Sequence, residues 1–192
     1  LKVKQKKGLM QKLLSGKVRL KGFDGEWEEV ELREIANLYQ PQTISQSMFV
    51  DCGYPVYGAN GLIGYFSKFN HETWQITITC RGSTCGTVNR TNGPAWITGN
   101  AMVVNCDNFE INKMFLYYKL LTGNFSSIIS GSGQPQIVLT PLLRWKIYIP
   151  VDKKEQSAIA SILSKCDKEI ELLKQKLELN KKQKKWLMQK LL

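Results

Sequence analysis

The chain has 192 residues, which is enough for one hydrophobic core with an appendage and too few for two domains of ordinary size. With 43% hydrophobic and 22% charged residues it has the composition of a soluble globular protein, and no apolar run approaches the length that crosses a bilayer, so we expect a cytoplasmic protein without a membrane partner. The formal net charge of +11 is concentrated at the two ends, because residues 22–180 hold 14 basic and 16 acidic residues, and this excludes a uniformly basic domain that coats DNA.

The N-terminal segment is basic and contains one copy of a repeated sequence. Residues 1–21 hold eight lysines and arginines and no acidic residue, which is typical either of a solvated helix face or of a contact to phosphate or to an acidic protein. KQKKGLMQKLL at residues 4–14 recurs as KQKKWLMQKLL at residues 182–192. This offset matches a whole domain with a connecting helix, so we predict a parent protein that contains the unit twice. The segment lacks the apolar stretch of a signal peptide, and the missing initial Met is expected for a fragment.

The region from Trp27 to Pro150 reads as short strands broken by Gly, Asn and Pro. One helix is predicted at residues 110–121, where apolar residues follow helical spacing up to a glycine. Aromatic residues such as Trp74 could stack on bases, but most of the aromatic residues fall at strand or helix core spacing, so core packing is the favoured interpretation. Strands are predicted at residues 54–58, 74–80, 100–106 and 144–150. The fold class expected for this region is α+β.

From Pro150 to its end the sequence predicts one long helix, capped by Asp152 together with Glu155 three residues later. Apolar residues recur in alternating four- and three-residue steps, which is the pattern of a coiled-coil seam. Asn180 and Lys184 interrupt the seam, which is consistent either with fixing its register or with fraying toward water. A small domain cannot bury such a long seam, so we expect a partner helix. The predicted partner-helix interface comprises Ile159, Leu163, Ile170, Leu173, Leu177, Leu187 and Leu191.

The chain lacks the residue patterns of common enzymes. His71 is its only histidine, its five cysteines form no Cys-x-x-Cys pair, and residues 40–150 contain four acidic residues. Neither a phosphate-binding loop nor a dinucleotide-binding loop nor a nucleophile elbow is present. We therefore expect no catalysis, no metal site and no cofactor in this chain, and reduced, mostly buried cysteines.

Four Gly-rich segments, at residues 57–65, 80–90, 97–102 and 130–141, concentrate side chains that suit the recognition of DNA bases. Arg pairs with guanine, Asn and Gln pair with adenine, and Gly allows close backbone approach. Taken singly, each loop is better interpreted as a tight turn capped by Asn or Ser. Four of them in a domain without catalytic groups favour recognition. The predicted DNA-binding residues are Tyr57, Asn60, Arg81, Ser83, Arg90, Asn100, Ser130, Ser132, Gln134 and Gln136.

The order of these motifs resembles the specificity subunit of type I restriction-modification systems, over almost the whole chain. The segments of this chain that resemble the recognition domain of that subunit are GEWEEVELREIA (25–36), PVYGANGLIGY (55–65), TITCRGSTCGTVN (77–89), WITGNAMVV (96–104) and SGSGQPQIVLTPLLRWKIYIP (130–150). The segments that resemble its conserved helical region are EQSAIASILSKCDKEIELLKQKLE (155–178) and the QKKWLMQKLL ending.

The resemblance implies three parts: the tail of a preceding conserved helix with a linker (1–21), a compact target recognition domain (22–150) and a conserved coiled-coil-forming dimerisation and spacer helix (151–192). It implies that this non-catalytic chain reads one half of a bipartite site in double-stranded DNA. Methyltransferase and restriction subunits are the implied partners, and S-adenosylmethionine and ATP are expected on those subunits. A homodimer through the long helix is a further expectation. Antiparallel pairing of the conserved helices implies that residues 1–14 pack against about residues 155–170.

An alternative function is that of a coiled-coil scaffold or adaptor that does not read DNA. Such a protein needs no polar loops, whereas this sequence has four. Titration of a labelled duplex, with and without random competitor DNA, distinguishes a DNA reader from a scaffold.

Overall fold

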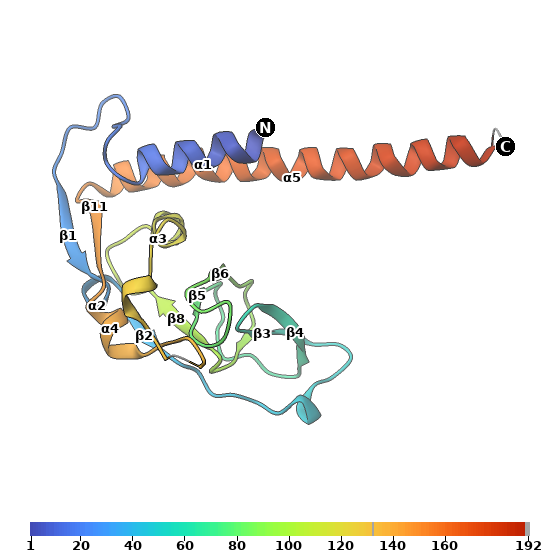
Figure 1. Ribbon diagram of the computed structural model, residues 1–192, viewed down its shortest axis with the longest axis horizontal. Helices are drawn as coiled ribbons and strands as arrows, with labels where there is room; N and C mark the ends of the chain where they lie inside the picture. The colour runs from blue at the N-terminus through green and yellow to red at the C-terminus, as the bar shows by residue number, and fades with distance from the viewer. Residues whose placement is uncertain (132, 191–192) are drawn as a thin grey trace.

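A computed structural model describes residues 1–131 and 133–190, in which a long helical arm leaves a mixed α+β body (Figure 1). The α+β fold class with a long C-terminal helix is therefore confirmed. In chain order the elements are α1 (Lys2–Leu13), β1 (Trp27–Glu31), α2 (Leu32–Ile35), β2 (Asn37–Tyr39), η1 (Gln46–Met48), β3 (Tyr54–Gly58), β4 (Gly61–Phe66), β5 (Ile76–Thr79), β6 (Val88–Arg90), β7 (Trp96–Ile97), β8 (Ala101–Asn105), α3 (Lys113–Leu121), η2 (Ser126–Ile128), β9 (Ile129–Ser130), β10 (Gln136–Ile137), α4 (Leu139–Leu143), β11 (Lys146–Pro150) and α5 (Lys153–Lys190).

Two small sheets form the centre of the body. One has the order β2-β8-β5-β6 with antiparallel neighbours, and the other has the order β4-β3-β7, in which β3 and β7 are parallel. All four side chains of β5 (ITIT) are buried, as are the first four of β8 (AMVV). β-Branched residues that are buried on both faces of a strand give the continuous apolar runs from which these strands were predicted.

Helix α3 lies between the four-stranded sheet and α5 (Figure 1). It begins three residues later than predicted, because Asn112 is its N-cap and its Oδ1 accepts a hydrogen bond from the Phe115 amide at 2.9 Å. The buried side chains of this helix belong to the main core, which also includes β5, β8 and the start of α5.

The chain enters and leaves the body at the same place, because β1 and β11 pair with Trp27 opposite Pro150. The helices that precede β1 and follow β11 consequently lie side by side, with α1 running toward the body and α5 running away from it (Figure 1). Two ion pairs join them, Lys2 with Glu169 and Lys6 with Asp167. The expected packing of residues 1–14 against the first part of the long helix is confirmed.

Candidate functional site

The loop that follows β5 is fixed to the hairpin of β9 and β10. Arg81 and Gln136 form an isolated antiparallel bridge, and the Gly82 amide donates a hydrogen bond to the Pro135 carbonyl at 3.0 Å. Within the hairpin Gln136 pairs with Ser130. Two predicted Gly-rich loops, some 50 residues apart in the sequence, therefore form one surface.

The turn between β3 and β4 lies against the same loop. Thr84 Oγ1 donates to Asn60 Oδ1 at 2.7 Å, and Thr79 Oγ1 donates to the Ala59 carbonyl at 2.6 Å. The carboxamide oxygen of Asn60 is thereby engaged within the protein, while its exposed amide nitrogen can donate to an acceptor outside.

The loop before β8 completes the group. The Cys80 thiol donates to the Asn100 carbonyl at 3.4 Å, and Gln40 Nε2 donates to the Gly99 carbonyl at 2.9 Å. Burial raises the pKa of Cys80, so the thiol stays protonated and keeps this donor at neutral pH. Cys80 therefore has a structural role beneath the exposed loops.

We call the polar residues on these four segments the loop cluster: Asn60, Arg81, Ser83, Asn100, Ser130, Gln134 and Gln136. All of them are exposed except Gln136, which is half-buried. Ser132, predicted as part of the same set, lies outside the described residues. The cluster presents a guanidinium, hydroxyl groups and carboxamides, which are the groups that pair with base edges. Among residues 1–131 and 133–190 no three His, Cys, Asp or Glu side chains are grouped to hold a metal ion.

Tyr57, another predicted DNA-binding residue, belongs to the packing of the body. It packs against a buried cluster of Ile97, Ala101 and Val103, and its hydroxyl accepts a hydrogen bond from the Asn92 amide at 3.1 Å. The side chain of Tyr57 is half-buried, and we do not include it in the loop cluster.

Arg90 lies at the opposite end of the β5–β6 pair. It faces Ile76, whereas the loop cluster begins after Thr79 at the other end of β5. Its guanidinium lies 5.8 Å from the ring centroid of Trp74 and 5.7 Å from that of Tyr117, and no acidic side chain in the described part of the chain forms an ion pair with it.

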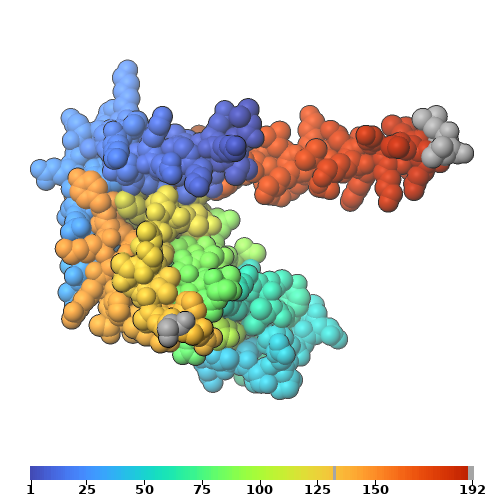
Figure 2. All heavy atoms as spheres, in the orientation of Figure 1, coloured from blue at the N-terminus to red at the C-terminus, as the bar shows by residue number. Residues whose placement is uncertain are grey.

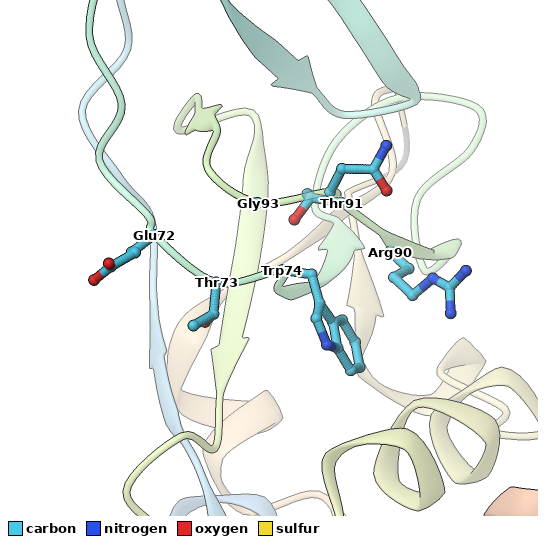
Figure 3. Close-up of a pocket in the computed structure, with 7 residues that line it drawn as sticks. Glu72, Thr73, Trp74, Arg90, Thr91 and Gly93 are labelled. Carbon is cyan, nitrogen blue, oxygen red and sulfur yellow. The ribbon is translucent and has the colours of Figure 1, made fainter.

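A pocket of about 520 Å³ adjoins Arg90 (Figure 3). Trp74 and Arg90 lie on one side of it, and Glu72 lies on the opposite side. Trp74 packs against the main core, as expected for a core residue, but it is half-buried and also lines this pocket.

The predicted seam of α5 divides into a covered and an exposed part. Ile159 and Leu163 are 1% and 0% exposed in the main core, so they are covered within the single chain, where α1 also packs on α5. Ile170 is half-buried beside α1. Leu173, Leu177 and Leu187 are exposed, and Leu191 lies outside the described residues.

The capping prediction for α5 was half wrong. Asp152 Oδ1 accepts a hydrogen bond from the Lys154 amide at 2.7 Å, as a cap does. Glu155, however, does not reach back to the helix start. Its carboxylate accepts two hydrogen bonds from Arg19, both at 2.7 Å, and one from Trp27 Nε1 at 3.3 Å. The sequence offered no signal for this contact, since Arg19 stands in a basic run that resembles a solvated surface.

Comparisons with known proteins place these features in a family. Residues 24–181 match the family model described as "Type I restriction modification DNA specificity domain". The chain is 32% identical over 114 residues to the type I restriction enzyme EcoprrI specificity subunit of Escherichia coli, an alignment that covers 59% of this chain and 28% of that protein.

The fold has counterparts among solved structures. The S subunit of a type I restriction-modification system from M. genitalium matches with a TM-score of 0.72 and 24% identity over 86% of this chain and 45% of that one. A structure described in terms of complex assembly and conformational transition of the type I R-M system matches with a TM-score of 0.63 and 18% identity over 93% and 49%. This chain thus spans less than half the length of these relatives. None of the helices in the described part of the chain has the length and apolarity needed to cross a bilayer.

Proposed function

Because this chain belongs to the family of type I restriction-modification DNA specificity domains, we propose that it reads one half of a bipartite DNA site without catalysing a reaction itself. The observation that carries this proposal is the loop cluster, in which exposed Arg, Asn, Gln and Ser side chains from four separate segments meet on one surface. Recognition of base edges needs such a set of donors and acceptors on a fixed backbone.

We assign a separate role to each of three parts of the chain. Residues 22–150 act as the recognition domain, residues 151–192 as the helix that binds partners, and residues 1–21 as the end of a preceding helix with its linker. The proposed partners are double-stranded DNA and the methyltransferase and restriction subunits. Methylation and cleavage would belong to those subunits, which would bring S-adenosylmethionine and ATP.

The DNA-reading proposal is tested by a titration of labelled duplex selected from a random pool. We expect the selected duplex to bind in the presence of excess random competitor, and binding to fall as salt rises. A chain that binds all duplexes equally, or none, would instead support the scaffold alternative.

Replacing Gln134 and Gln136 with alanine is expected to relax the preference at particular base pairs of the half-site. Each bidentate contact is worth about 1–3 kcal/mol of discrimination, so the selectivity at those positions should fall by about ten-fold or more. Selection from randomised DNA measures the change. Gln46→Ala, at an exposed glutamine on η1 outside the four loop segments, is the matched control. Unaltered preferences in the double variant would remove this hairpin from the proposed reading surface.

We also propose that two copies of the chain associate through α5 in antiparallel orientation. The repeat supports a specific register, since residues 182–192 have the sequence of residues 4–14 and α1 shows how that sequence docks on α5. Lys2 and Lys6, which bind Glu169 and Asp167, correspond to Asn180 and Lys184. A second α5 in the place of α1 would then cross the first near Gln175.

This register brings the predicted seam residues of the two chains together. Leu173 faces Leu177 of the second copy, Ile170 faces Asn180, and Leu163 faces Leu187. The seam was derived from the sequence period and the register from the docking of α1, so their agreement supports the arrangement. The one difference between the repeats, Gly8 against Trp186, does not oppose it at the first side-chain atom, because a Cβ at Gly8 would meet nothing within 4 Å.

The arrangement makes α1 a competitor of the second copy, so removal of residues 1–11 is expected to strengthen the dimer by about ten-fold or more. The deletion stops short of Leu13 and Leu14, which are 3% and 2% exposed and belong to the core. Sedimentation of the complete and shortened chains over a concentration series measures the effect. Adding Leu187→Asp to the shortened chain should cancel the gain. A shortened chain that dimerises no better than the complete one contradicts the competition.

A further inference from the structure

The arm is helix α5, and the direction of this long helix depends on how its first turns are held. Every described side chain from Glu171 to Gln189 is exposed, so the outer part of α5 has no support from the body (Figure 2). At about 1.5 Å per residue the 38 residues of α5 measure about 57 Å, and a change in direction of about 5° at the base would move the tip by about 5 Å. Any function that depends on where the arm points must therefore fix its first turns.

Several polar side chains tie the first part of α5 to the body. Gln156 Oε1 accepts a hydrogen bond from the Asn112 amide at 2.9 Å, and Asp167 Oδ2 accepts one from the Tyr118 hydroxyl at 2.7 Å. Both of these contacts tie α5 to α3 or to its cap. Glu155 ties α5 to the linker that enters the body, whereas Asp167 also reaches the preceding helix α1 through Lys6. The carboxylate of Glu155 is fully buried.

The partners of Glu155 are themselves held in place. The Arg19 fork binds both carboxylate oxygens, and its guanidinium lies 5.7 Å from the ring centroid of Trp27, which donates the third hydrogen bond. The linker runs against the same ring, because a Cβ at Gly16 (φ +72°) would lie 3.2 Å from Trp27. Lys119 lies 5.7 Å from the Trp27 ring centroid, and its ammonium donates to the Leu14 carbonyl at 2.6 Å. Linker, β1, α3 and α5 thus meet at one point.

We propose that Glu155 is the positioning residue of the arm: its carboxylate, held by Arg19 and Trp27, fixes the angle at which α5 leaves the body and thereby the spacing between two DNA half-sites. Apolar contacts such as those of Ile159 and Leu163 have no preferred direction, whereas a bidentate fork does. Without it, α5 retains its bonds to α3 and its ion pairs with α1, and the two paired helices can swing together about α3. The claim about spacing rests on the proposed function, and the claim about the angle does not.

The angle is tested by the distance between two spin labels within one chain. One label is attached to the exposed Cys52 and the other to a cysteine introduced by Gln189→Cys, with Cys85→Ser and Cys166→Ser to prevent other labelling. Labelled chain is diluted into unlabelled chain, so that only distances within a chain are measured. We expect one narrow distance distribution for the parent and at least a two-fold broader one for Glu155→Gln.

Two further variants complete this test. Arg19→Lys keeps the charge but loses the fork, so its distribution should have an intermediate width, and it decides the question if Glu155→Gln fails to fold. Glu178→Gln is the matched control, because that carboxylate forms an exposed ion pair with Lys181 on the arm itself, and it should leave the distribution unchanged. Distributions for Glu155→Gln and Arg19→Lys as narrow as that of Glu178→Gln would overturn the proposal.

The spacing is tested in an assembly that contains two recognition domains, by selection from DNA with a variable number of base pairs between the half-sites. Glu155→Gln should widen the range of accepted spacers while the bases preferred within each half-site stay the same. If the range of accepted spacer lengths is unchanged while the distribution of label distances broadens, the contact of Glu155 with Arg19 and Trp27 does not control the spacing. If the parent shows no base preference at all, the proposed function fails, and the label distances still decide the role of Glu155.

Discussion

Replacing Leu173 and Leu177 with aspartate is expected to abolish the association of two chains through α5, with a loss of affinity of at least about 100-fold. In the proposed register each aspartate enters the apolar centre of the seam, where an unpaired carboxylate is costly, and the dimer contains four of them. Both leucines are exposed in the single chain, at 47% and 55%, so the recognition domain should remain folded. Sedimentation equilibrium measures the association, and thermal unfolding checks the fold.

The matched control for this prediction is the pair Leu172→Asp and Leu179→Asp. These leucines are 65% and 55% exposed and lie seven residues apart on a stripe that is about a third of a turn away from the seam. They should weaken association much less than the seam pair. Equal losses for the two pairs would mean that general apolarity, and not the predicted seam, drives assembly, and unimpaired association of the seam variant would remove the seam altogether.

Replacing Arg19 with methionine is expected to lower the free energy of unfolding by about 3 kcal/mol, because it leaves the carboxylate of Glu155 buried without its ion pair. The side chain of Glu155 is 1% exposed and that of Arg19 is 28% exposed, so solvent can replace the lost donor only in part. Urea unfolding followed by circular dichroism measures the change.

Lys146→Met provides the comparison for Arg19. Lys146 binds Glu29 at 2.9 Å, but both side chains are more than half exposed, and such pairs are worth about 0–1 kcal/mol. A loss for Arg19→Met no larger than for Lys146→Met would show that the ion pair of Arg19 with Glu155 does not stabilise the fold more than an exposed pair does.

Local patterns in the sequence determined most of the elements. Continuous β-branched runs gave β5 and β8, and the helical spacing up to Gly123 gave α3 apart from its start at Asn112. The four Gly-rich loops were also apparent, because glycine and small polar residues mark turns by their own conformational preferences. The repeat in residues 4–14 and 182–192 predicted a parent protein that contains the unit twice, and the family resemblance implied the pairing of residues 1–14 with the long helix.

Tertiary structure alone decided which of these residues meet. Arg81 and Gln136 share one surface because the loop after β5 forms a bridge to the β9–β10 hairpin, more than 50 residues away. Arg90 is removed from them because the antiparallel strand β6 carries it to the other end of β5. Periodicity predicts that a helix has an apolar face but cannot say how much of that face its own domain covers.

The base of the arm shows the same division most clearly. The sequence by itself determined that α5 is one helix and that Asp152 begins it, since both depend on neighbouring residues. It assigned Glu155 to the cap, whereas the folded chain binds that carboxylate to Arg19, 136 residues away. The pairing of β1 with β11 brings these two residues together, and a contact created by distant segments leaves no mark in the local order of either one.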